Sequence, residues 1–215
     1  TLGFSSAASD VYKRQFLKQL KDVAKTCKEK EIKIVTNAGG LNPKSMANEI
    51  QIILSELGLE MQVAYIDGDD LMPRMSDLQN SGEEFINIDK EISLKDSGYT
   101  TLTANAYLGA WGIKEALDRG AEIVVCPRVT DAAVVIGPAA WKFDWKRDDF
   151  DQLAGALAAG HIIECGCQAT GGNYAFFEEV PSFENVGFPI AEIQSDGSFF
   201  ITCLLYTSPS PRDDC

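Results

Sequence analysis

The pattern of apolar and polar positions predicts helices that alternate with short strands. Residues 16–30 place their apolar side chains on one helical stripe with lysines opposite, which predicts an amphipathic helix. IKIVT, residues 32–36, is a short β-branched run and predicts a buried strand. Two more strands are predicted over residues 61–66 and 122–126, and further helices over residues 43–57, 71–79, 106–119 and 150–164, with a small apolar helix starting near residue 131.

Local signals refine these boundaries. Asn42 and Pro43 are the N-cap and first-turn residues that a helix start favours, and Gly58 is a typical helix stop. Residues 83–101 have no strong period and are expected to form a surface excursion. Residues 190–194 and 198–202 flank an Asp196-Gly197 turn and predict a hairpin. The predicted class is therefore α/β: an open, mainly parallel sheet flanked by helices, with an antiparallel hairpin near the C-terminal end.

Both ends of the chain have an unusual origin. Back-translated, residues 5–15 and 203–213 contain inverted copies of one DNA element and resemble the paired adapters of a transposase-made sequencing library. Residues 1–15 and 203–215 are therefore expected to be non-native tails, and residues 16–202 a truncated natural segment of a metagenomic fragment. We expect both tails to be unpacked.

The net charge and the cysteine spacing limit the binding partners and the cellular compartment that we expect. The chain carries a net charge of −13, and the charges of the two predicted tails cancel. Such an acidic surface disfavours nucleic acid and anionic membranes, and no apolar run reaches membrane-spanning length. The cysteines outside the tails have no repeated C-x-x-C spacing, which disfavours a zinc ribbon or a disulfide framework and favours a reducing compartment. We expect a cytoplasmic location.

Three predicted strands end in polar loops, which begin at Asn37, Asp67 and Arg128. In an open parallel sheet such loops gather at one edge, where ligands bind. Each loop also has a purely structural interpretation. Gly39 and Gly40 suit a tight turn, and Asp69, Asp70, Thr130 or Asp131 suit helix caps.

These loops suggest specific chemistry at the shared edge. Arg128 can grip a carboxylate or phosphate, and the glycine N–H groups of residues 37–40 can bind the same anion. Asp67 and Asp131 are candidate acid/base residues. Asp67, Asp69 and Asp70 could instead hold a hard cation such as Mg²⁺. The spacing matches neither G-x-G-x-x-G nor a P-loop, so a nucleotide is not indicated.

A second candidate centre lies at the end of the helix over residues 150–164. His161, Glu164 and Cys165 have the i, i+3, i+4 spacing of one helix face, so a His–Cys pair could activate a thiolate with Glu164 orienting the imidazole. N–H donors for an oxyanion could come from the turn of Gly171, Gly172 and Asn173. The alternative is a small core cysteine and a histidine that binds the helix C-terminus.

Seven motifs, taken in order, resemble the N-terminal domain of the acyclic terpene utilisation protein A family. They are TNAGGLNP (residues 36–43), DGDDL (67–71), TANAYLGA (103–110), RVTDA (128–132), GPAAW (137–141), AGHIIECGCQATGGNYAF (159–176) and NVGFPIAEI (185–193). The positions that match the family are Asn37, Gly39, Gly40, Asp67, Asp69, Asp70, Asn105, Arg128, Asp131, Glu164, Cys165, Gly171, Gly172 and Asn173. We expect truncation to have removed the family's opening strand–glycine loop and the glycine-rich segment that follows the hairpin.

The resemblance implies a pathway more firmly than a reaction. Proteins of this family occur in bacterial degradation of acyclic isoprenoids such as citronellol and geraniol, through CoA thioesters and beside an acyl-CoA carboxylase. One expectation is a catabolic enzyme for an acyl or CoA-ester ligand, with Asn105 and Arg128 among its ligand-binding residues. The alternative is a non-catalytic ligand-binding or scaffold subunit that partners the carboxylase. A homo-oligomer is expected in either case.

Overall fold

The computed structural model describes residues 14–203. The predicted tails lie outside the described residues except for Arg14 and Gln15, which begin helix α2, and Cys203, which ends strand β5. Cys203 pairs with Pro189 in the hairpin, so the expectation of an unpacked tail is wrong at this residue.

A three-stranded parallel sheet forms the centre of the fold, which confirms the predicted α/β class. Its strands are β1 (Ile34–Thr36), β2 (Val63–Tyr65) and β3 (Ile123–Val125), in the spatial order β1-β3-β2. The central strand β3 pairs with β1 and β2 in parallel. Its side chains are completely buried because helices cover both faces.

The order of the strands decides which helix covers which face. The connection from β1 passes over β3 to reach β2, whereas the connection from β2 returns in the opposite direction to β3. Since parallel crossovers are right-handed, the two connecting helices must lie on opposite faces. Helix α3 (Pro43–Glu56) accordingly packs with α2 (Arg14–Glu29) on one face, and α5 (Trp111–Asp118) packs with α6 (Ala133–Lys142) on the other.

The side chains of β3 alternate between these two cores. Ile123 and Val125 join the core beneath α2 and α3, and Val124 and Cys126 join the core beneath α5 and α6. Helix α3 starts as predicted, because Asn42 Oδ1 accepts a hydrogen bond from the N–H of Ser45 at 3.0 Å.

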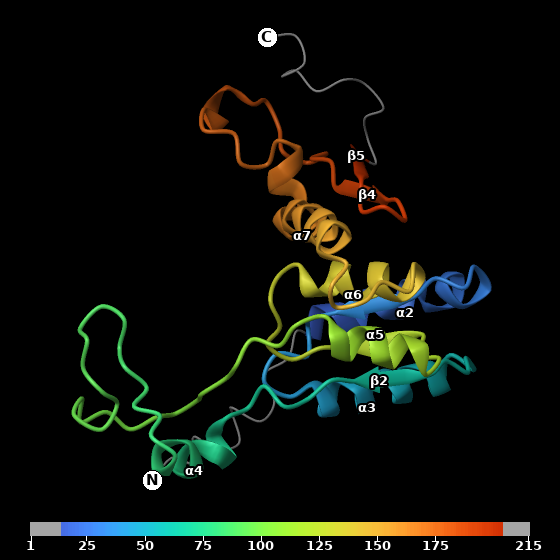
Figure 1. Ribbon diagram of the computed structural model, residues 1–215. Coiled ribbons are helices and arrows are strands. Elements are labelled where there is room, and N and C mark those ends of the chain that lie inside the picture. Colours follow the sequence, from blue (N-terminus) through green and yellow to red (C-terminus); the bar gives the residue numbers. More distant parts are fainter. Residues whose placement is uncertain (1–13, 204–215) are drawn as a thin grey trace.

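Helix α7 (Phe150–Cys165) and the hairpin of β4 (Pro189–Ile193) and β5 (Phe199–Cys203) form a further layer, on the side of α6 that faces away from α3 (Figure 1). The hairpin turn lies directly on α7. A Cβ at Gly155 would stand 1.9 Å from the carbonyl oxygen of Gly197, so only glycine fits there. Trp145 Nε1 also donates to the carbonyl of Ser195 at 2.9 Å. Two short 3₁₀ turns, η2 (Gly166–Thr170) and η3 (Phe177–Glu179), lie between α7 and the hairpin.

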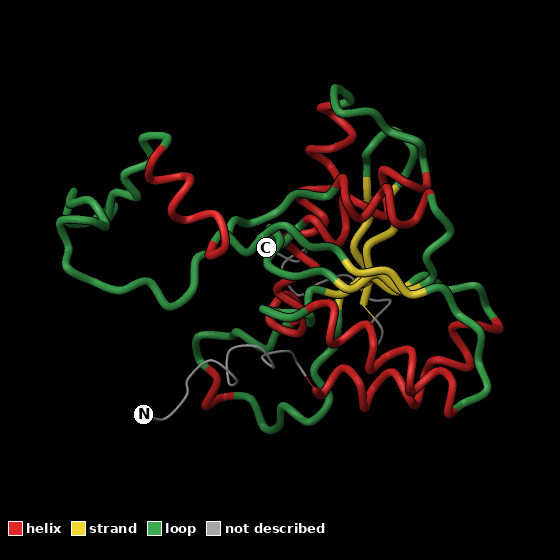
Figure 2. Tube along the Cα trace, turned by 90° about the horizontal axis from the view of Figure 1, so that it is seen from below, coloured by secondary structure: helices red, strands yellow, loops and turns green. Residues whose placement is uncertain are grey.

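Residues 71–104 extend away from the sheet as a long arm, seen from two directions in Figures 1 and 2. The arm contains η1 (Met72–Arg74) and α4 (Met75–Asn80), which together replace the helix predicted over residues 71–79. Residues 83–101 contain no helix or strand, as predicted for a surface excursion. An isolated bridge between Asp70 and Asn105 joins the two ends of the arm.

The prediction of a helix over residues 106–119 is wrong in its first part, because α5 begins only at Trp111. Ala106 donates its N–H to the carbonyl of Asp69 at 2.8 Å, and Leu108 donates to the carbonyl of Arg128 at 3.0 Å. These long-range bonds hold the chain extended. Within the described residues, no helix is long and apolar enough to cross a membrane.

Candidate functional site

The carboxyl ends of β1 and β3 define a topological switch point. The loop after β1 leads to α3 on one face of the sheet, and the loop after the neighbouring strand β3 leads to α6 on the other. Open α/β sheets bind their ligands in the crevice that such diverging loops create. The loops that begin at Asn37 and Arg128 both leave from this switch point, so the predicted convergence of polar loops has a geometric basis.

The loop after β1 lies close to the end of β3. A Cβ at Gly39 would stand 2.6 Å from the carbonyl oxygen of Cys126, so this approach requires glycine. Gly40 has a φ of 55°, which is the left-handed conformation that glycine tolerates best. The N–H of Ala38 donates to Thr36 Oγ1 at 3.1 Å, and Asn37 is exposed at the tip.

Asp69 is the buried polar centre of this edge. The residue is only 4% exposed. Its Oδ2 accepts hydrogen bonds from Asn105 Nδ2 at 2.8 Å and from the backbone N–H of Arg128 at 3.4 Å. Asp69 therefore connects the loop after β2, the end of the arm and the loop after β3. Sequence reasoning treated Asp69 as a cap or a cation ligand, whereas the structure gives it an internal connecting role.

Arg128 is exposed at the same edge and lies against Tyr107. Its guanidinium carbon is 4.9 Å from the centre of the tyrosine ring, and Nη2 donates to the tyrosine hydroxyl. Stacking on an aromatic ring orients the planar guanidinium while leaving other N–H groups open to an anion. Tyr107 was not among the predicted site residues. Its only signal was its place in the TANAYLGA motif next to Asn105.

The three carboxylates predicted as a possible magnesium site have separate environments. Asp70 Oδ1 accepts a hydrogen bond from the N–H of Met72 at 2.9 Å, which is a local turn bond. The N-cap of η1 is Leu71, with no side-chain capping bond, so the interpretation of Asp70 as a helix cap is wrong. Asp67 is exposed and Asp69 is buried against Asn105. Among the described residues, no group of three His, Cys, Asp or Glu side chains is arranged to hold a metal ion.

The end of α7 lies next to the loop after β3. A Cβ at Gly160 would stand 2.7 Å from the Cβ of Ala132, the residue that follows Asp131. This close packing sets the second half of α7 against the start of α6. Asp131 itself is exposed, and the N-cap position of α6 is Ala132, with no side-chain capping bond.

The three residues of the second centre are all exposed on the last turns of α7. His161 Nδ1 lies 3.0 Å from the carbonyl oxygen of Leu157, and because a carbonyl only accepts, Nδ1 is the donor. Within the part of the chain that the structure describes, no hydrogen bond joins His161 to Glu164 or to Cys165. The helix spacing was therefore predicted correctly, but the imidazole uses one nitrogen for its own helix.

The turn after α7 also has internal hydrogen bonds. Gly171 has a φ of 108°, and the N–H of Gly172 donates to the carbonyl of Cys167 at 2.8 Å. This N–H is thus engaged and does not point freely towards an oxyanion. Asn173 is exposed. Of the cysteines, burial raises the pKa of the Cys126 thiol to about 12, whereas Cys165 and Cys167 are exposed.

Fold and edge together define a doubly wound α/β protein whose candidate ligand site lies at the carboxyl edge of its sheet. A family model described as "Acyclic terpene utilisation family protein AtuA" matches residues 4–207. The chain belongs to this family, which confirms the predicted membership. No curated protein and no solved structure matches the chain.

Proposed function

We propose that this chain is part of a catabolic enzyme of acyclic isoprenoids that acts on a branched acyl or CoA-ester ligand at the β1–β3 switch point. Family membership supports the setting of acyclic terpene utilisation. The arrangement of Arg128 carries the proposal: its backbone N–H donates to a buried carboxylate, and its guanidinium is stacked on Tyr107 at the carboxyl edge of the sheet.

In this proposal Arg128 binds the ligand's carboxylate or phosphate group, together with the loop at Asn37, Gly39 and Gly40 that follows the neighbouring strand β1. Asp67 and Asp131 are exposed carboxylates at the same edge and take the roles of proton donor or acceptor. Cys165 with His161 is a second candidate centre.

Ligand-dependent stabilisation tests the role of Arg128. The CoA thioester of citronellic acid should raise the thermal unfolding midpoint of the protein, because a ligand at 100 times its Kd adds roughly 2.7 kcal/mol. Arg128→Ala should lose most of this shift, and Arg128→Lys should keep part of it, since lysine retains charge without the planar fork. Lys25→Ala, on the distant helix α2, is the matched control.

Catalysis is measured separately by following the thioester by mass spectrometry. The enzyme proposal is supported if the unaltered chain turns the thioester over and the Arg128→Ala variant folds but no longer does so. An unchanged ligand shift and unchanged growth on citronellol with Arg128→Ala would refute this role for Arg128.

One observation favours the second function, a scaffold subunit for an acyl-CoA carboxylase. The segment after α7 exposes several aromatic side chains, with Phe176 at 64% and Phe177 at 61%, on a surface suited to protein contact. Co-purification with carboxylase subunits, lost on Phe176→Ser with Phe177→Ser and independent of any thioester, would support the scaffold over the enzyme.

A further inference from the structure

Strand β2 has an edge that nothing covers in the described part of the chain. It pairs with β3 alone: Ile66 donates its N–H to the carbonyl of Val125 at 2.9 Å, and Ile123 donates to the carbonyl of Gln62 at 3.1 Å. Backbone groups alternate sides along a strand, so those of Val63 and Tyr65 point away from β3. Edge strands are usually protected by lysine, proline or a bulge, and QVAYI, residues 62–66, contains no lysine or proline.

An open cleft runs along this edge. It has a volume of about 370 Å³ and lies between β2 and helix α5, which contributes Gly112, Glu115 and Arg119 to its wall. Tyr65 at this edge is 39% exposed, whereas every side chain of the central strand β3 is completely buried. The cleft therefore leaves both apolar side chains and backbone hydrogen-bonding groups open to an extended segment.

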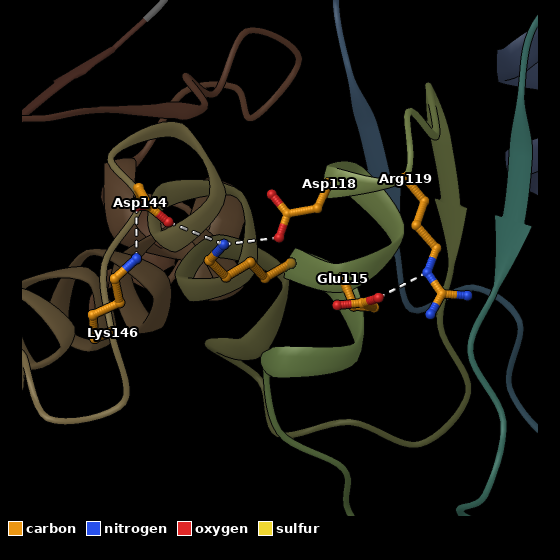
Figure 3. Close-up of polar contacts among 6 residues, drawn as sticks. Glu115, Asp118, Arg119, Asp144 and Lys146 are labelled. Carbon is orange, nitrogen blue, oxygen red and sulfur yellow. Dashed lines mark hydrogen bonds and ion pairs between the residues drawn. The ribbon is translucent and has the colours of Figure 1, made fainter.

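The charges at the rim of the cleft specify the occupant. Glu115 and Arg119 form an i,i+4 ion pair at 2.7 Å, with both side chains at least 60% exposed. Figure 3 shows this pair on the side of α5 nearest the strands, while Asp118 lies on the other side of the helix towards Asp144. A two-fold axis places the α5 helices of two copies antiparallel to each other. The arginine of each copy then lies opposite the glutamate of the other copy, so the two charged surfaces are complementary.

We propose that the β2 edge is the interface of a homodimer, in which two copies pair their β2 strands antiparallel about a two-fold axis midway between the two Ala64 residues. Val63 of each copy then exchanges backbone hydrogen bonds with the second copy's Tyr65. This cross-strand contact joins a β-branched and an aromatic side chain, which is a favourable pair in sheets. On the opposite face, the small Ala64 side chains leave room for the Glu115–Arg119 contacts between the two α5 helices.

The oligomeric state of the chain, measured by sedimentation velocity over a concentration series, tests the proposal. The unaltered chain should be a dimer. Arg119→Glu should raise the dimer Kd by more than roughly tenfold, because the symmetric ion pair occurs twice and becomes repulsive. The charge-swapped variant E115R/R119E should restore dimerisation. Lys25→Glu, which makes the same charge change in the exposed i,i+4 pair of α2, should leave the Kd unchanged.

Tyr65→Pro provides an independent variant, because it removes an outward N–H and leaves the hydrogen bonds to β3 in place. It should give a monomer with an unchanged far-ultraviolet circular dichroism spectrum. If Tyr65→Pro fails to fold, the charge-swap series decides. A monomer at all concentrations, or a dimer that is insensitive to Arg119→Glu, overturns the proposal.

Discussion

The connecting role of Asp69 leads to a quantitative prediction for Asp69→Ala. The substitution removes Oδ2, which accepts hydrogen bonds from Asn105 Nδ2 at 2.8 Å and from the Arg128 N–H at 3.4 Å. Asp69 is only 4% exposed, so water does not replace these bonds readily. A hydrogen bond to a charged group contributes roughly 1.5–3 kcal/mol, and the longer of the two bonds adds little. We therefore expect the free energy of unfolding to fall by about 2–3 kcal/mol.

Urea unfolding measures this loss as a lower midpoint at constant slope. A double-mutant cycle with Asn105→Ala isolates the bond, and we expect a coupling energy of about 1–2 kcal/mol. Asp67→Ala, at an exposed carboxylate two residues earlier, should change stability by no more than roughly 0.5 kcal/mol. A loss below that level for Asp69→Ala, or a coupling near zero with Asn105, would show that Asp69 does not connect the loops.

Three further predictions concern one closely packed glycine and two titrating side chains. Gly39→Ala should destabilise the fold by roughly 1–3 kcal/mol in urea unfolding, because its Cβ would meet the Cys126 carbonyl at 2.6 Å, whereas Gly109→Ala has open space and should be tolerated. Burial raises the pKa of the Cys126 thiol from 9.0 to about 12. The stability that this thiol contributes is therefore fully present below pH 9 and should decline by up to about 1.4 kcal/mol per pH unit as the pH rises towards 12. Cys126→Ala should flatten this decline. Burial raises the pKa of Glu122, but hydrogen bonds from the Gln62 N–H and from Lys28 outweigh burial and lower the pKa below 4.5. The stability that Glu122 contributes is therefore present above pH 4.5 and lost as the pH falls. Glu122→Gln should lose less stability at acidic pH in the same assay.

The strands and most helices could be predicted because their signals are local. Asn42 and Pro43 start α3 as expected, and the Asp196-Gly197 turn forms the predicted hairpin. The segment before Trp111 misled the prediction for a physical reason. Its small and apolar residues favour a helix, but hydrogen bonds to Asp69 and Arg128, distant in sequence, hold it extended.

The candidate site was predictable only as far as strand ends determine it. Parallel pairing places Asn37, Asp67 and Arg128 at one edge of the sheet whatever their side chains do. The burial of Asp69 and the stacking of Tyr107 on Arg128 depend on the bridge at the base of the arm, which no periodicity reveals. At the end of α7, helical spacing grouped His161 with Cys165, but it could not show that the imidazole bonds to Leu157.

The bridge between Asp70 and Asn105 brings the two ends of the long arm between β2 and α5 together. Because these two ends are paired, lengthening or shortening the chain between them changes mainly the entropy of closing a loop, which varies slowly with loop length. Evolution is thus free to remodel this protrusion, even by inserting a small module, without disturbing the register of the sheet beneath it.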